Sequence, residues 1–212
     1  MSVRRGKILA WMGAAILAGG CAAARPIKYY ELTVPPGAGQ TSDATTLPVT
    51  LLVASIQASH LYREDPIVYS GNGEAMGTYE NQRWSQPPVE MLQEFVGREL
   101  RASGHYRAVN SLRSNGGGDY ILRGRLYDFK EVEGSGGLVA RVVVEFELHE
   151  AKTGSTVWSQ YYSHDEPVSS KDVPAVVAAL DRNTQNIVGQ IKASLDQYFS
   201  AHPPSVTAPA PQ

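Results

Sequence analysis

The residue with the clearest chemical potential is Cys21, the only cysteine among the 212 residues. A single cysteine cannot form an internal disulfide. It follows a basic start with three cationic residues, an apolar run over residues 8–17 and the small residues 18–20. This order is typical of a secretion signal, and the run is shorter than the ~20 residues that a permanent membrane helix needs. The other role of a free cysteine, a small buried apolar residue, is disfavoured because no periodic apolar residues follow Cys21.

The stretch Leu-Ala-Gly-Gly-Cys over 17–21 resembles a bacterial lipobox, in which the cysteine sulfur receives a diacylglyceryl group and a peptidase cuts just before the cysteine. Ala18 stands where leucine is more common. The resemblance implies a lipoprotein signal peptide over 1–20 and a lipidated tether over 21–27. Two or more acyl chains, at ~0.8 kcal/mol per buried CH₂, would hold the protein on a membrane almost permanently. The residue after the cysteine is alanine rather than aspartate, which implies sorting to the outer membrane.

No other motif indicates catalysis or a cofactor. The five histidines have no metal-ligand spacing, and neither a G-x-S-x-G nor a Walker motif occurs. His164, Asp165 and Glu166 come closest to a cluster, which we interpret as a solvated strand end. Glu145 and Glu147 would share one side of a strand, but a solvated sheet face does not separate the pKa values of two carboxyls. We therefore predict a non-enzymatic protein without metal or cofactor; an enzyme would need a pocket combining residues such as His60, His164 and Asp165.

Aromatic residues are frequent in the N-terminal half. They could fill the core, or the outward members could form a partner interface, where tyrosine and tryptophan are enriched. The candidates for a partner interface are Tyr29, Tyr30, Tyr62 and Trp84.

The composition is that of a globular domain, with 42% hydrophobic and 19% charged residues. The net charge of −2 gives no reason to expect nucleic acid as a partner. Amphipathic periodicity predicts a helix over 87–104 and a long helix over 172–199, capped by Asp172. Alternating or continuous apolar runs predict strands over 28–34, 49–57, 106–112, 119–132, 138–151 and 155–165, and a hairpin over 67–84.

The fold class that follows is α+β: a two-layer domain over 28–200, with an antiparallel or mixed sheet covered on one face by two helices. A simple hairpin between the strands at 119–132 and 138–151 would place Arg123 opposite Glu145. The Pro-rich tail over 201–212 is predicted to be disordered.

Several segments together resemble the ABC-type transport auxiliary lipoprotein component family. They are the lipobox cysteine, YYEL (29–32), LYREDPIVYS (61–70) and RWSQPPVEMLQEFVGRELRASGHYRAV (83–109). The later strands and the terminal helix fit the same layout, so the resemblance spans about residues 21–200.

The resemblance implies a non-catalytic accessory of an ABC system that moves lipids between two bacterial membranes. The partners it implies are a mammalian-cell-entry-type substrate-binding protein and an ABC permease and ATPase, all as separate chains. A homo-oligomer is also compatible with the sequence. The alternative is another envelope lipoprotein, such as an activator of a cell-wall synthase or a scaffold.

Overall fold

The computed structural model describes residues 25–33, 46–71, 75–114, 116–134 and 136–204. The predictions for the signal peptide, for Cys21 and for residues 205–212 of the tail lie outside these ranges. Within them, no helix is both long and apolar enough to cross a membrane.

A mixed nine-stranded sheet is built around one long strand, β7 (Tyr120–Gly134). Strand β8 (Gly137–Glu150) pairs antiparallel along one side of β7, and β9 (Thr156–Pro167) follows antiparallel beyond β8. Along its other side β7 pairs in parallel with three short strands in turn, β2 (Leu47–Val53), β3 (Gln57–Ala58) and β4 (Pro66–Ser70). The sheet therefore forks into two branches on this side.

Each branch ends in a different edge strand. Next to β2 lies β6 (Tyr106–Ser111), in parallel. Next to β4 lies β5 (Met76–Trp84), antiparallel, and β1 (Lys28–Tyr30) then pairs in parallel with β5. A single 3-10 turn, η1 (His60–Tyr62), lies between β3 and β4. The predicted strands over 106–112, 119–132, 138–151 and 155–165 and the 67–84 hairpin are confirmed. The strand predicted over 49–57 is instead two strands, β2 and β3, because residues 54–56 interrupt it and β7 pairs with each part separately. Strand β1 is shorter than the predicted 28–34.

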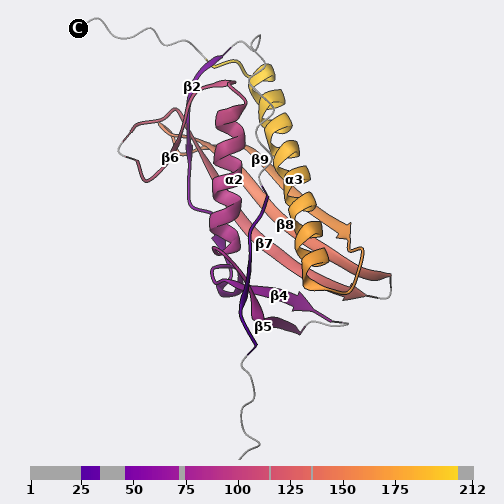
Figure 1. The fold of residues 1–212 in the computed structure, drawn as a ribbon. Coiled ribbons are helices and arrows are strands. Elements are labelled where there is room, and N and C mark those ends of the chain that lie inside the picture. The colour runs from indigo at the N-terminus through magenta and orange to yellow at the C-terminus, as the bar shows by residue number, and fades with distance from the viewer. Residues whose placement is uncertain (1–24, 34–45, 72–74, 115, 135, 205–212) are drawn as a thin grey trace, which may run out of the picture.

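Two helices, α2 (Pro88–Ala102) and α3 (Val173–Ala201), lie side by side over one face of the sheet (Figure 1). The Asp172 side chain accepts a 2.9 Å hydrogen bond from the backbone N–H of Ala175, as expected of an N-cap. At the end of α2, Gly104 has a φ of 67°, which is the left-handed conformation that glycine adopts most easily. The α+β fold class and the two-layer arrangement are confirmed.

The register of the β7–β8 hairpin differs from the prediction. Arg123 lies opposite Glu147, and Arg125 lies opposite Glu145, so the predicted pairing of Arg123 with Glu145 was wrong. The strands pair as far as Gly134 opposite Gly137, so a regular ladder from this turn would place Arg123 opposite Leu148. The register shift between Leu126 and Asp128 moves the pairing by one residue, to Glu147. The predicted pairing would need a turn centred on Gly134, whereas the turn lies between Gly134 and Gly137.

The apolar stripe of α3 contains a polar interruption that periodicity does not reveal. Asn183 is fully buried, and its Nδ2 donates hydrogen bonds to the backbone oxygens of Ala140 in β8, at 2.9 Å, and of His164 in β9, at 2.8 Å. Its Oδ1 has no hydrogen-bond partner among the described residues. One side chain thus ties the long helix to two neighbouring strands, which fixes the position of α3 on the sheet.

Replacing Asn183 by aspartate should lower the free energy of unfolding by about 3 kcal/mol or more at neutral pH. The change removes both donors and places a carboxylate against two carbonyl oxygens in a buried site. Burial raises the pKa of such a carboxyl, so the loss is largest at high pH and shrinks as the pH falls through that raised pKa. Denaturant unfolding at several pH values measures this loss in the free energy of unfolding. Asn186→Asp, an exposed change on the same helix, is the control, and equal effects of the two variants would contradict the role of Asn183.

Two glycine substitutions should have opposite effects on stability. A Cβ at Gly124 would lie 2.8 Å from a ring carbon of Phe146, so Gly124→Ala should cost about 1–3 kcal/mol through overpacking. Gly189 is exposed in α3 with nothing within 4 Å of a Cβ, so Gly189→Ala should add roughly 0.5–1 kcal/mol of helix stability. The thermal unfolding midpoints of both variants test these predictions. An unchanged midpoint for Gly124→Ala would contradict the close packing of Gly124 against Phe146.

Candidate functional site at the N-terminal end of the sheet

The first described segment of the chain is held against the domain at two places. In β1, Lys28 pairs with Gln82 and Tyr30 with Trp84, and the Tyr30 hydroxyl donates a 2.7 Å hydrogen bond to Gln82 Oε1. Three residues later, the backbone N–H of Thr33 donates to Asp181 Oδ1 in α3 at 3.0 Å. The route from residue 28 to residue 33 is therefore fixed by both the sheet and the long helix.

The neighbouring side chains strengthen this attachment. Leu32 is buried, and Gln185 donates a 3.1 Å hydrogen bond to the Thr33 oxygen. Burial raises the pKa of Asp181, and the hydrogen bonds from Thr33 and Gln185 act in the opposite direction. Lys28 begins β1, which lies at an edge of the sheet where the described residues supply no further strand partner.

The four aromatic residues that were candidates for a partner interface are placed differently. Tyr29 is 62% exposed, and Tyr30 is partly buried against the core. Tyr62 and Trp84 are each 1% exposed. The Tyr62 hydroxyl donates to Asp128 Oδ1 at 3.1 Å, and the Trp84 ring packs edge-on against Phe129 with centroids 5.5 Å apart. Tyr62 and Trp84 therefore belong to the core, and Tyr29 is the outward member of the set.

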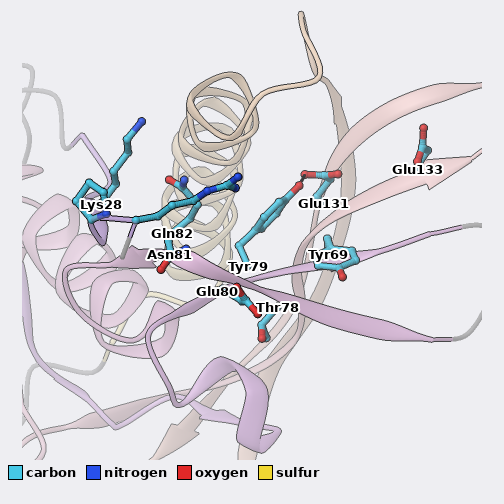
Figure 2. Close-up of a pocket in the computed structure, with 11 residues that line it drawn as sticks. Lys28, Tyr69, Thr78, Tyr79, Glu80, Asn81, Gln82, Glu131 and Glu133 are labelled. Carbon is cyan, nitrogen blue, oxygen red and sulfur yellow. Dashed lines mark hydrogen bonds between the residues drawn. The ribbon is translucent and has the colours of Figure 1, made fainter. Parts of the chain in front are cut away.

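A hollow of about 660 Å³ lies beside β1 (Figure 2). It is lined by Arg25, Pro26 and Lys28 and by side chains of β4, β5 and the far end of β7. On one side Tyr79 and Glu131 point toward each other, and the Tyr79 hydroxyl donates a 2.7 Å hydrogen bond to Glu131 Oε2. Burial, followed by the contact with Glu131, raises the pKa of the Tyr79 hydroxyl, so it stays a donor at physiological pH. Arg25 and Lys28 supply positive charge on the side of the tether.

A glycine shapes the aromatic wall of this hollow. Tyr69 and Gly77 are paired across β4 and β5, and a Cβ on Gly77 would lie 2.6 Å from the Tyr69 ring. The missing side chain lets the Tyr69 ring lie over the neighbouring strand. There it meets Tyr79 with ring centroids 5.0 Å apart.

Neither the hollow nor the inward position of Glu131 was predicted from the sequence. The available signal is spacing: Phe129 and Glu131 are two residues apart on one strand and both are buried, so a carboxylate occupies an inward position. The hydrogen-bonding partner Tyr79 lies 52 residues earlier in the chain and comes close only because β4 and β5 join β7.

A second hollow of about 510 Å³ lies on the sheet face away from the helices. Glu145 and Glu147 share this face, as predicted. Each already has a partner: the Tyr127 hydroxyl donates to Glu145 at 2.7 Å, and Glu147 lies 3.0 Å from His149 Nε2. The surface is a polar sheet face in which the two carboxylates are held separately.

Asp165 and Glu166, next to His164, are held in separate ion pairs and are not grouped into one site. Asp165 makes a two-point contact with Arg141 at 2.6–2.7 Å, and the hydrogen bond from Arg141 lowers the pKa of Asp165. Glu166 pairs with Arg182 at 2.9 Å. His60 pairs with Glu64 at 3.1 Å on the exposed 3-10 turn. Within the described ranges no three of His, Cys, Asp and Glu are grouped as metal ligands would be.

Solved structures with the same fold come from several bacteria. Protein XCC0632 from Xanthomonas campestris matches with a TM-score of 0.67 and 23% identity, over 80% of this chain and 99% of its own. Protein CT253 from Chlamydia trachomatis matches with a TM-score of 0.53 and 10% identity, over 73% and 99% respectively. At these identities the matches show the fold alone. No curated protein sequence matches the chain.

The family comparison is more specific, because one sequence model covers most of the domain. Residues 30–192 match the model of the ABC-type transport auxiliary lipoprotein component. The match begins in β1 and ends in α3, so it includes both branches of the sheet and both helices. The chain belongs to the ABC-type transport auxiliary lipoprotein component family.

Proposed function

We propose that the protein is a lipid-anchored accessory of an ABC-type system that moves phospholipids between the two membranes of the cell envelope. Cys21 carries the lipid, the anchor sits in the outer membrane, and the domain faces the periplasm without catalysing a reaction. The observation that carries the proposal is the attachment of β1 to β5, which begins only seven residues after the lipobox cysteine in a chain of this family.

The short reach of the tether supports a docking role. Six residues, 22–27, separate Cys21 from β1, and six extended residues span at most about 20 Å. Because residues 28–33 are held by the sheet and by α3, they add no reach. A domain confined this closely suits a fixed component at one membrane. An activator that must reach a cell-wall synthase needs a longer tether.

The partners in this proposal are a mammalian-cell-entry-type substrate-binding protein and, through it, a permease and an ATPase on separate chains. Tyr29 supports a contact at the tethered edge, because a large aromatic side chain with 62% of its surface exposed is typical of interface residues. It lies on β1, whose other edge has no strand partner among the described residues. Such an edge can bind an extended segment of another chain.

A lipid anchor on Cys21 would determine the cell fraction in which the protein is found. Cys21→Ser removes the sulfur that takes the lipid, so the protein should move from the membrane pellet to the soluble envelope fraction. Wild type processed in parallel is the control, and immunoblots of both fractions make the measurement. Unchanged membrane retention of Cys21→Ser would argue against the anchor.

If the partner binds at the edge of β1, a crosslinking residue placed on this strand should react with the partner. A photo-crosslinking residue in place of Tyr29 should give an adduct with the mammalian-cell-entry-type protein in intact cells. The same residue in place of Gln190, exposed on α3, controls for random collisions. Mass spectrometry identifies the adduct. No adduct at position 29, or an equal yield at both positions, would contradict the proposed contact.

A further inference from the structure

The hollow beside β1 contains a buried acidic group without a matching cation. Glu131 is 9% exposed, and its hydrogen bond among the described residues comes from the neutral Tyr79 hydroxyl. No lysine or arginine of the described ranges lies within ion-pair distance of Glu131. By contrast, Glu133, two residues later, is paired with Lys171 at 2.7 Å. A carboxylate that lines a hollow without a positive partner can accept a cationic ligand, which would form an ion pair with it.

Two aromatic rings stand next to this carboxylate. Tyr69 and Tyr79 line the same hollow as Glu131, with their ring planes tilted by 55° (Figure 2). The faces of tyrosine rings attract ammonium groups, most strongly where water is partly excluded. A carboxylate beside two such rings therefore fits a small organic ammonium. Asn81 and Gln82 also line the hollow, and amide oxygens accept hydrogen bonds from the N–H groups of a primary ammonium.

Positive charge lines the hollow on the side of the tether. Arg25 and Lys28 lie in the segment that leads to Cys21, and these are the side chains that bind phosphate groups most often. The hollow thus combines an anionic, aromatic wall with a cationic wall, which matches a ligand carrying both a phosphate and an ammonium.

The position of the hollow indicates the source of such a ligand. Arg25 is four residues after Cys21, so a lipid on Cys21 would keep Arg25 within about 14 Å of the membrane surface. A volume of about 660 Å³ is within the range of small-molecule sites. A phospholipid headgroup could enter while its acyl chains remain in the bilayer.

We propose that this hollow binds the phosphoethanolamine headgroup of a membrane phospholipid, with the ammonium at Glu131, Tyr69 and Tyr79 and the phosphate at Arg25 and Lys28. The inference deepens the proposed function, since the anchor on Cys21 is what brings the hollow to the membrane. A phosphocholine headgroup fits less well, because its methylated nitrogen has no N–H to donate. A phosphoglycerol headgroup lacks the positive charge altogether.

The first test is a titration of the full lipoprotein in detergent with glycerophosphoethanolamine, followed by calorimetry. Glu131→Gln preserves the size of the side chain and removes its charge, so it should weaken binding at least tenfold. Glu147→Gln, a carboxylate on the other face of the sheet, is the matched control and should leave binding unchanged. Glycerophosphoglycerol should bind at least tenfold more weakly to the wild type. Equal binding of the two ligands, or an unaffected Glu131→Gln, would overturn the proposal.

A second variant guards against loss of folding. Tyr69→Leu keeps an apolar side chain over Gly77 but removes the aromatic face, and should weaken glycerophosphoethanolamine binding at least threefold with an unchanged thermal unfolding midpoint. Normal binding by a folded Tyr69→Leu would contradict the aromatic contribution.

A third experiment separates the lipid from a free phosphoester. The anchored protein in nanodiscs containing phosphatidylethanolamine should show slower amide hydrogen exchange over 76–82 than in nanodiscs of phosphatidylglycerol alone. Equal amide exchange in the two kinds of nanodisc would exclude a membrane phospholipid as the source of the bound headgroup. The titration uses neither a membrane nor partner proteins, so its failure would contradict the headgroup site alone. The proposed function is tested separately, by the release of Cys21→Ser from the membrane fraction and by the crosslink at position 29.

Discussion

The attachment of β1 to the edge of β5 is the constraint on which the rest of this account depends. Three residues of strand, the buried Leu32 and the bonds of Thr33 to α3 hold the beginning of the domain in place. Without them, residues 28–33 would not be fixed to the domain. With them, the side of the domain that carries β1, β4 and β5 is the side at which the described chain begins. In the proposed function this is the side that faces the membrane.

The same constraint gives the hollow its composition. Its cationic side comes from the segment before β1, while its anionic and aromatic side comes from β5, β4 and β7. Glu131 could be placed inward because Tyr79 donates to it across the sheet, and the Tyr69 ring has room because position 77 is a glycine. The interior of the domain is fixed separately by α3, whose Asn183 holds the carbonyls of β8 and β9. The helices and long strands therefore support an open, polar edge of the sheet, where the proposed headgroup site lies.

Local patterns in the sequence were enough to predict both helices, most of the strands and the fold class, and they failed where distant residues decide. The cap at Asp172, the glycine at 104 and the alternation along β8 are local, and each appears in the structure as expected. The partner of Arg123 depends on the position of the turn, between Gly134 and Gly137, and on the register shift between Leu126 and Asp128, and an alternating pattern reveals neither. Trp84 and Tyr62 were candidates for a surface, yet both fill the core, because an aromatic residue gives the same signal in either setting.

The central claim, that the lone thiol anchors this domain to a bilayer, is tested most directly by mass spectrometry of the mature protein isolated from membranes. The account predicts an N-terminal peptide that begins at Cys21 and carries the added mass of a diacylglyceryl group. An unmodified N-terminus that begins at any other residue would contradict it.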